Sequence, residues 1–134
     1  MIRLALILCC LPLLAGADSL RERLRALVPP PDPYAQEKAD DLARIAREPV
    51  LFTEGQAIAM FTHPDCDLCG HAEAELQALS KALGVGVQIL NTQSPANAAL
   101  MERLSLDLLP SYVMPDRLIR GQMPSFVLER YLTR

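Results

Sequence analysis

Two cysteines, three positions apart, carry the clearest chemistry in this sequence. Cys66 and Cys69 follow an apolar run over residues 57–61 that has the length of a buried strand, and a helical pattern begins at Cys69. The start of a helix offers unpaired backbone N–H groups and the positive end of the helix dipole, and both favour a thiolate over a thiol. We therefore expect Cys66 to be the attacking nucleophile and Cys69 to be the resolving thiol. This arrangement is typical of a redox site.

Two other interpretations of the cysteines have to be weighed. One is an inert structural disulfide, but a bridge between Cys66 and Cys69 closes a very small ring, which constrains the unfolded chain little. The other is a zinc or copper site, whose ligands would be His63, Cys66, Cys69 and His71. On a regular helix His71 points away from both sulfurs, and after the N-terminal pair at Cys9 and Cys10 the sequence has no second cluster of cysteine or histidine. We expect no metal and no cofactor, because the cysteines themselves carry the electrons.

Charged and polar side chains flank the first cysteine. Asp65 and Asp67 place negative charge beside Cys66, which opposes the effect of the helix dipole on the thiolate. Asp65 could instead cap the helix. His63 precedes Cys66 by one turn, where it could donate to the thiolate or remain an exposed loop histidine. We expect these three residues to tune the pKa of the nucleophile and to leave it only moderately acidic.

The first residues have the pattern of an export signal. A short basic segment over residues 1–3 precedes an apolar stretch over residues 4–14, and small side chains follow at 15–17. The apolar stretch is shorter than the ~20 residues that a membrane span requires. An uncleaved anchor and lipidation at Cys9 or Cys10 are the alternatives. We expect a cleaved signal peptide over residues 1–17, a periplasmic location and no stable membrane anchor afterwards.

Length and composition exclude several classes of protein. The chain has 134 residues, which corresponds to one domain, and a net charge of −3 without a basic run, so we expect no nucleic-acid partner. Cleavage of the signal would remove Cys9 and Cys10 and leave a single cysteine pair. A small secreted scaffold held by several disulfides is therefore excluded.

The segment after the signal is predicted to be a helical arm. Residues 18–28 form an amphipathic pattern with Leu20, Leu24 and Leu27 on one side, a run rich in proline follows over residues 29–33, and a second helical pattern covers 34–47. We interpret residues 18–48 as an arm that packs on the domain or flexes from it. A dimer contact through the three leucines is a further alternative, so we expect a monomer or a weak dimer.

From residue 49 onward strands and helices alternate. The segment 50–53 is predicted to be a short strand or a lead-in, and Gly84 and Ser94 are predicted as caps. The expected elements are strand 57–62, helix 69–83, strand 85–90, helix 96–104, strands 111–114 and 117–120, and helix 125–132. The order β-α-β-α-β-β-α predicts an α/β fold over residues 49–134.

This order, with Cys66 and Cys69 at the end of its first strand, resembles the thioredoxin-like superfamily. Members place a cis-proline at the start of the third strand, roughly forty residues after the cysteines, and Leu109–Pro110–Ser111 stands there in this sequence. The resemblance implies a thioredoxin-like fold in which Leu109 and Pro110 bind the substrate peptide, Leu109 through its backbone. Met60 occupies the position where cytosolic thioredoxins carry a buried acid.

Within the superfamily, the segment 60–66 looks most like the periplasmic Dsb-type thiol–disulfide oxidoreductase and isomerase branch, which also has Phe-Thr before its cysteines. The resemblance implies an exported thiol–disulfide oxidoreductase that acts on protein thiols and disulfides and is reset by a partner protein. An apolar rim around the site is expected from Leu68, Leu109 and Tyr112. The motif does not decide between oxidation, isomerisation and reduction. A non-catalytic binding or assembly module of an envelope complex, of the conjugation or cytochrome-maturation type, is the alternative.

Overall fold

The computed structural model describes residues 15–134. A boundary between two compact units falls between Pro33 and Tyr34. The basic and apolar parts of the expected signal peptide lie outside the described residues. Within residues 15–134, no helix combines the length and the apolar character that a membrane crossing needs.

The first unit contributes the helix α1 (Ala15–Leu27) to the described part of the chain. The amphipathic helix predicted over residues 18–28 therefore forms, with ends that differ by a few residues. Its apolar side chains are exposed, namely Leu20, Leu24 and Leu27, together with Val28 beyond its end.

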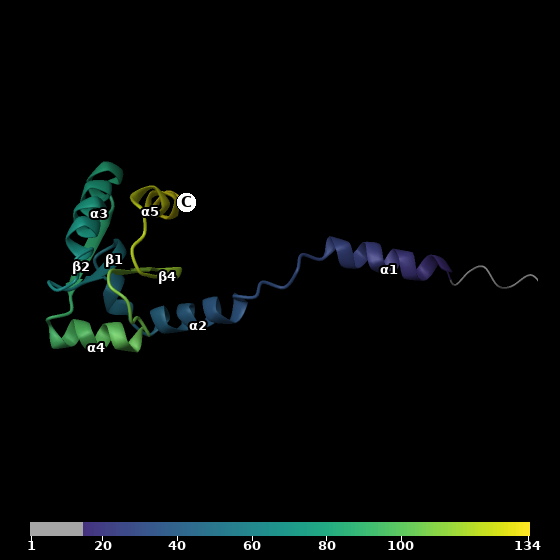
Figure 1. Cartoon of the computed structure of the whole chain (residues 1–134), viewed down its shortest axis with the longest axis horizontal. Coiled ribbons are helices and arrows are strands. Elements are labelled where there is room, and N and C mark those ends of the chain that lie inside the picture. The colour runs from purple at the N-terminus through teal and green to yellow at the C-terminus, as the bar shows by residue number, and fades with distance from the viewer. Residues whose placement is uncertain (1–14) are drawn as a thin grey trace, which may run out of the picture. The chain divides into compact units, whose positions relative to one another are not determined.

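The second unit is built on a four-stranded sheet with the order β2-β1-β3-β4 (Figure 1). The strands are β1 (Gln56–Thr62), β2 (Gly86–Asn91), β3 (Ser111–Met114) and β4 (Arg117–Arg120). β2 runs parallel to β1, β3 is antiparallel to β1, and β4 is antiparallel to β3. β1 and β3 are therefore interior strands, and β2 and β4 form the two edges.

Helices cover both faces of the sheet (Figure 1). One face packs against α3 (Cys69–Leu83) and α5 (Ser125–Leu132). The other face packs against α2 (Ala35–Ala46), the short 3-10 helix η1 (Pro49–Phe52) and the region of α4 (Pro95–Arg103). This layering confirms the predicted α/β fold class and the order β-α-β-α-β-β-α.

The interior strand β1 explains why residues 57–61 read as a continuous apolar run. Ile58 and Met60 belong to the core on the side of α3 and α5, whereas Ala59 and Phe61 belong to the opposite core. All four side chains are buried, because successive residues of a strand point to opposite faces and both faces are covered. Thr62 is the last residue of β1, and the cysteine motif follows directly after it.

The helix α3 begins at Cys69 and ends before Gly84, as its sequence predicts. Cys69, Ala72 and Leu76 form its buried stripe at intervals of three and four residues. Gly84 adopts the left-handed conformation, with φ of 67°, and its backbone N–H donates to the carbonyl of Ser80. This geometry suits glycine, which has no Cβ to clash, and it ends the helix.

The segment 50–53, predicted to be a short strand or a lead-in, is not a strand. The helix η1 starts at Pro49, which is suited to a first helical turn, and its Leu51 side chain inserts into the core. The helix α2, expected as part of an arm that packs on the domain or flexes from it, lies in the same compact unit as the sheet, and this unit covers Tyr34–Arg134.

A buried contact of α2 explains this boundary. Asp41, on α2, is buried and accepts hydrogen bonds from Arg120 of β4 at 2.8 and 3.1 Å, and Ile45 joins the core one turn later. Asp41 and Ile45 lie four residues apart and therefore on one face of α2. We call the Asp41–Arg120 pair the α2 clamp.

Candidate functional site

The cysteine pair forms a disulfide at the junction of β1 and α3. The Cα atoms of Cys66 and Cys69 are 5.4 Å apart. Between Thr62 and the helix the chain makes two tight turns, in which the N–H of Cys66 donates to the carbonyl of His63 at 3.0 Å and the N–H of Cys69 donates to Cys66 at 3.1 Å. The turns place the first cysteine ahead of the helix and the second in its first turn.

The two cysteines differ in their access to solvent. Cys69 is only 2% exposed and belongs to the buried stripe of α3, whereas Cys66 is half-buried in the turn. Cys66 is therefore the more accessible cysteine of the disulfide, and Cys69 is sheltered by the domain. This is the geometry that distinguishes an attacked sulfur from a leaving or resolving one.

The flanking charged residues lie in the same turn. The side chain of Asp65 is 92% exposed, and Asp67 is also exposed, so water screens the effect of both carboxylates on the sulfur. Asp65 does not cap α3: Leu68 occupies the cap position, and no side chain makes a capping hydrogen bond there. The positive end of the helix dipole is thus not neutralised by a capping carboxylate.

His63 is oriented by the backbone of the turn. Its Nδ1 atom accepts a hydrogen bond from the N–H of Asp65 at 3.1 Å. In the neutral imidazole the proton then resides on Nε2. Of the two roles predicted for His63, donation to the Cys66 thiolate is therefore left to Nε2 alone, while Nδ1 holds the turn.

The start of β3 lies beside the cysteine turn. Ser111 pairs with Phe61 in the antiparallel register, so Pro110 comes next to the end of β1. The Leu109–Pro110 peptide bond is cis, Pro110 is buried, and Ser111 Oγ donates to the carbonyl of Leu108 at 2.6 Å. The β1–β3 register therefore places Leu109 and Pro110 at the same end of the sheet as Cys66. The linear sequence does not show this proximity.

The apolar rim differs from the one predicted. Tyr112 is fully buried and is not part of a rim, because β3 is an interior strand covered on both faces. The exposed apolar side chains near the motif are Leu68, which is 51% exposed, and Leu108, which is 53% exposed. Leu109, by contrast, is partly buried against the core. Sequence reasoning missed Leu108, whose only signal is its place in the loop before Pro110.

A methionine and a tyrosine lie side by side in the core near the motif. Met60 and Tyr112 are partners in the β1–β3 register and both are fully buried on the side of α3. Burial raises the pKa of Tyr112, and the backbone of Met123 opposes this shift only in part, since the hydroxyl makes no regular hydrogen bond to the described residues. The phenol stays protonated at neutral pH, so it is no base for the cysteines.

The histidine of the proposed metal set lies elsewhere. His71 Nε2 is 3.5 Å from Glu75 Oε1 on the surface of α3, and its side chain is 70% exposed. No group of three or more His, Cys, Asp or Glu side chains in residues 15–134 is arranged to hold a metal ion.

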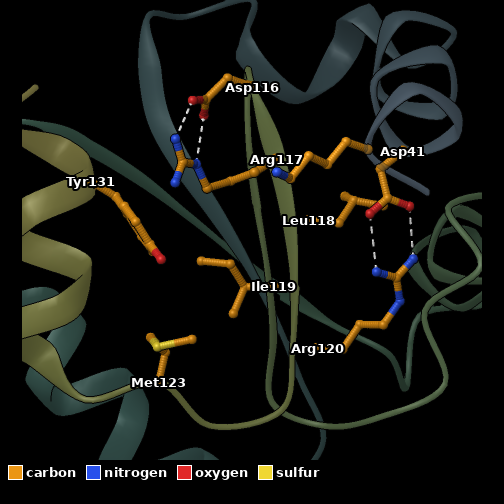
Figure 2. A pocket seen from close by; sticks show the side chains of 9 residues that line it. Asp41, Asp116, Arg117, Leu118, Ile119, Arg120, Met123 and Tyr131 are labelled. Atoms are coloured by element: carbon orange, nitrogen blue, oxygen red, sulfur yellow. Dashed lines mark hydrogen bonds and ion pairs between the residues drawn. The ribbon is translucent and has the colours of Figure 1, made fainter. Parts of the chain in front are cut away.

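A cavity of about 370 Å³ lies along the edge strand β4 (Figure 2). Its lining residues come from α2, β4 and α5 and the segments next to them, and none belongs to the cysteine turn. Its charged groups pair with one another: Arg120 bonds Asp41, and Arg117 bonds Asp116 at 3.0 Å while it stacks on Tyr131 at 4.1 Å. We therefore interpret the cavity as a space between α2, α5 and β4, whose lining side chains connect these elements.

Two solved structures resemble part of this chain. A solution structure of a thioredoxin-like protein from Clostridium perfringens matches with a TM-score of 0.50 and 21% identity, over 57% of this chain and 67% of that one. A structure of thioredoxin-2, described as a component of the protein secretion machinery of the malaria parasite, matches with a TM-score of 0.46 and 18% identity, over 57% of this chain and 79% of that one. No protein-family model and no curated protein sequence matches the chain.

The fold and the cysteine geometry together define the chemistry at a general level. The chain has a thioredoxin-like fold, and a Cys66–Cys69 disulfide lies at its strand–helix junction. The likeness to the solved structure concerns the fold, and the close cysteine pair is the feature that supports a thiol-redox role in general.

Proposed function

We propose that this protein is an exported thiol–disulfide oxidoreductase of the Dsb type, which exchanges disulfides with protein thiols through Cys66 and Cys69. The observation that carries the proposal is the unequal burial of the two cysteines within one disulfide. Because only one sulfur is open to a large substrate, exchange has a defined point of entry. The apolar stretch and small residues of 1–17 support export.

In the oxidising direction a substrate thiolate attacks Sγ of Cys66. The Cys66–Cys69 bond breaks, its electron pair leaves on Sγ of Cys69, and a mixed disulfide joins the substrate to Cys66. A second substrate thiolate then attacks the substrate sulfur of that bond, which yields a substrate disulfide and the dithiol form of the protein. Two electrons pass to the cysteine pair, and the thiol protons of the substrate pass to the solvent or to the cysteines.

In the reducing direction the same steps run backwards. The Cys66 thiolate attacks a substrate disulfide, and Cys69 resolves the mixed disulfide by attacking Cys66. The first turn of α3 stabilises the Cys66 thiolate, since the positive end of its dipole faces the turn. Either direction needs a partner protein that returns the pair to its starting state, and neither needs a cofactor.

The substrate chain is held next to the exposed sulfur. Leu109 offers its backbone and Pro110 shapes the loop before the start of β3, while exposed Leu68 and Leu108 provide apolar contact. These features fit an extended, partly unfolded segment of a protein, whose backbone and apolar side chains are accessible. Proteins that are still folding after export have such segments.

A trapping experiment with matched variants tests the proposal. The single-cysteine variants, in the thiol form, are mixed with an unfolded protein that contains disulfides, whereas the oxidised wild-type chain is mixed with the same protein in its reduced form, and products are separated without reductant. We expect Cys69→Ser to accumulate a mixed disulfide with the substrate and Cys66→Ser to form none. The wild-type chain should transfer its disulfide and end in the dithiol form. Equal trapping by both variants, or a pair that no thiol buffer reduces, would overturn the proposal in favour of a non-catalytic module.

A redox titration of the same protein then assigns the direction. A midpoint near the value of about −120 mV that is typical of strong oxidants indicates a disulfide donor, and one near about −270 mV indicates a reductase.

A further inference from the structure

The side chain of His63 closes a small ring with the backbone of the cysteine turn. Its Nδ1 atom accepts the hydrogen bond from the N–H of Asp65, two residues further on, at 3.1 Å. Asparagine and aspartate close the same ring, the Asx turn, with a side-chain oxygen. The carbonyl of His63 also accepts the N–H of Cys66 at 3.0 Å. The side chain and the backbone of His63 therefore both hold the segment that carries the first cysteine.

A histidine in this position differs from an asparagine because it can gain a proton. Neutral imidazole has a lone pair on Nδ1, whereas both ring nitrogens of the charged form are donors. The N–H of Asp65 then faces another donor and loses its acceptor. Histidine is the side chain that changes its charge between about pH 5 and about pH 8. The hydrogen bond between His63 and Asp65 is therefore available to the neutral ring alone.

Asp65 also offers a partner to the charged ring. Its Oδ2 atom lies 3.6 Å from Nδ1 of His63, which is ion-pair distance once the imidazole is charged. The side chain of His63 is 30% exposed and that of Asp65 is 92% exposed, so the ring can take a proton from solvent and burial does not hold the carboxylate in place. Protonation thus exchanges a bond to the backbone of Asp65 for an ion pair with its side chain.

The neighbouring loops bring no other charge to the ring. The side chain of Thr92 donates to the last residue of β1 at 3.0 Å, which places the loop after β2 beside the turn, and residues 91–94 are uncharged. The start of β3 pairs with the end of β1, and residues 110–111 are a proline and a serine. The charge of Asp107, in the loop before them, acts on Arg120 of β4.

The other titratable groups of the cysteine motif and of α3 are engaged differently. Asp67 is exposed to solvent in the same turn, and His71 lies 3.5 Å from Glu75 of its own helix. Among the described residues, Asp65 is therefore the charged group that lies within ion-pair distance of His63.

We propose that His63 is a proton-dependent positioning residue of the cysteine turn, which holds the backbone of Asp65 when neutral and pairs with the carboxylate of Asp65 when charged. The charged ring then adds a positive charge beside the residue that precedes Cys66, and this favours the Cys66 thiolate. The reactivity of Cys66 declines less steeply with acid than that of a thiol without such a neighbour. The inference rests on the proposed function, in which Cys66 is the attacking thiol, and adds a dependence on pH to it.

The first test follows the wild-type chain by NMR between about pH 5 and about pH 8, in the oxidised form and over residues 18–134, the part expected after export. The sequence has two histidines, so two imidazole rings titrate. We expect the amide proton of Asp65 to shift together with the ring of His63 and independently of the ring of His71. An amide proton of Asp65 that does not move while the ring of His63 titrates overturns the inference. This test needs no substitution that could disturb folding.

The second test is the rate at which a small reagent alkylates Cys66 in the same chain with Cys69→Ser, which has no other thiol. The comparison is His63→Asn, whose side-chain oxygen can accept the N–H of Asp65 but cannot gain a charge. We expect equal rates near about pH 8, where the ring is neutral, and a rate about twofold to threefold higher with His63 than with asparagine near about pH 5. The amide proton of Asp65 should no longer titrate in His63→Asn.

The matched control is His71→Asn, which removes an imidazole from the exposed surface of α3 and should leave the pH profile unchanged. A ratio of the His63 and His63→Asn rates that stays constant across the pH range overturns the inference. Neither test uses a protein substrate, whereas the trapping experiment does. Failure of the pH dependence and failure of the proposed function are therefore distinguishable.

Discussion

The Cys66–Cys69 disulfide and the Asp41–Arg120 ion pair differ in the kind of bond and in the distance along the chain that each one spans. The disulfide is covalent, yet it joins cysteines only three positions apart. The α2 clamp is non-covalent, yet it joins Asp41 to Arg120, which lie 79 positions apart. The disulfide joins residues that the backbone turns already hold close together. The ion pair joins the helix α2 to the edge strand β4.

The difference separates chemistry from architecture. A disulfide that closes a small ring removes little entropy from the unfolded chain, so its presence is explained better by exchange than by stability. A buried carboxylate that receives two hydrogen bonds from a guanidinium ties distant segments together, and its loss leaves a partly buried charge unpaired. Variants at the two links should therefore affect different measurements.

The largest expected effect is the loss of exchange in Cys66→Ser. The rate of disulfide transfer to a model peptide should fall at least about a thousandfold, because no other sulfur can accept the attack. The free energy of unfolding should change by no more than about 2 kcal/mol, since the ring is small. Urea unfolding of the variant and of the reduced wild-type chain measures this. A large loss of stability in both would assign the disulfide an architectural role.

The opposite result is expected for Asp41→Ala. Removal of the carboxylate takes away the hydrogen bonds from Arg120 and Arg44, leaves Arg120 with a longer ion pair to Glu37 at 3.8 Å, and should lower the free energy of unfolding by about 2 kcal/mol. Exchange should be unaffected, because the clamp is remote from the cysteine turn. The matched control is Asp116→Ala, whose pair with Arg117 is exposed and should cost less than about 1 kcal/mol. Equal losses in the two variants would contradict the role of the clamp.

A smaller effect is expected from acid. Hydrogen bonding and charge from Arg103 hold the pKa of Glu48 below its ordinary value of 4.5, and Arg117 likewise lowers that of Asp116 below 3.8. Both groups bind their proton more weakly in the folded chain, so their contribution is present above these ordinary values and is lost as the pH falls through the lowered ones. Urea unfolding between about pH 7 and about pH 3 should show this decline, and Glu48→Gln should make it shallower. An unchanged slope in that variant would remove the Glu48–Arg103 pair from the account.

The smallest effect is expected at Asp67. Its exposed carboxylate weakly disfavours the neighbouring thiolate, so Asp67→Asn should speed alkylation of reduced Cys66 at neutral pH by about twofold. Gln77→Glu, on the exposed surface of α3, serves as a remote change of charge. A rate that does not change would show that water screens the carboxylate completely.

Local signals predicted most of the fold. The bounds of α3, β3, β4 and α5 agree with the sequence, because each carries its own signal: a buried stripe with Gly84 behind it, a turn at Pro115–Asp116 between two short strands, and a final amphipathic stretch. The cysteine turn was also predictable, since its residues are contiguous. Its unequal burial of the two sulfurs depends on the buried stripe of α3, which the spacing of Cys69, Ala72 and Leu76 indicates.

Long-range features could not be predicted in the same way. The partner of Asp41 lies on another element, and nothing near Arg120 in the sequence points to it. A weak signal existed, because Asp41 precedes Ile45 by four residues and so shares the buried side of its helix. Tyr112 was placed on the rim because a four-residue strand covered on both faces has no alternation to reveal which side is open.

The unequal shelter of the two sulfurs gives the protein a chemical signature that can be followed over time. After reduction of a chain that lacks residues 1–17, and with them Cys9 and Cys10, a small alkylating reagent should add in two separate mass steps, first on Cys66 and later on Cys69, which only local opening of α3 exposes. The delay between the steps then reports how often the first turn of that helix opens. The cysteine pair therefore also reports the local opening of the helix that shelters Cys69.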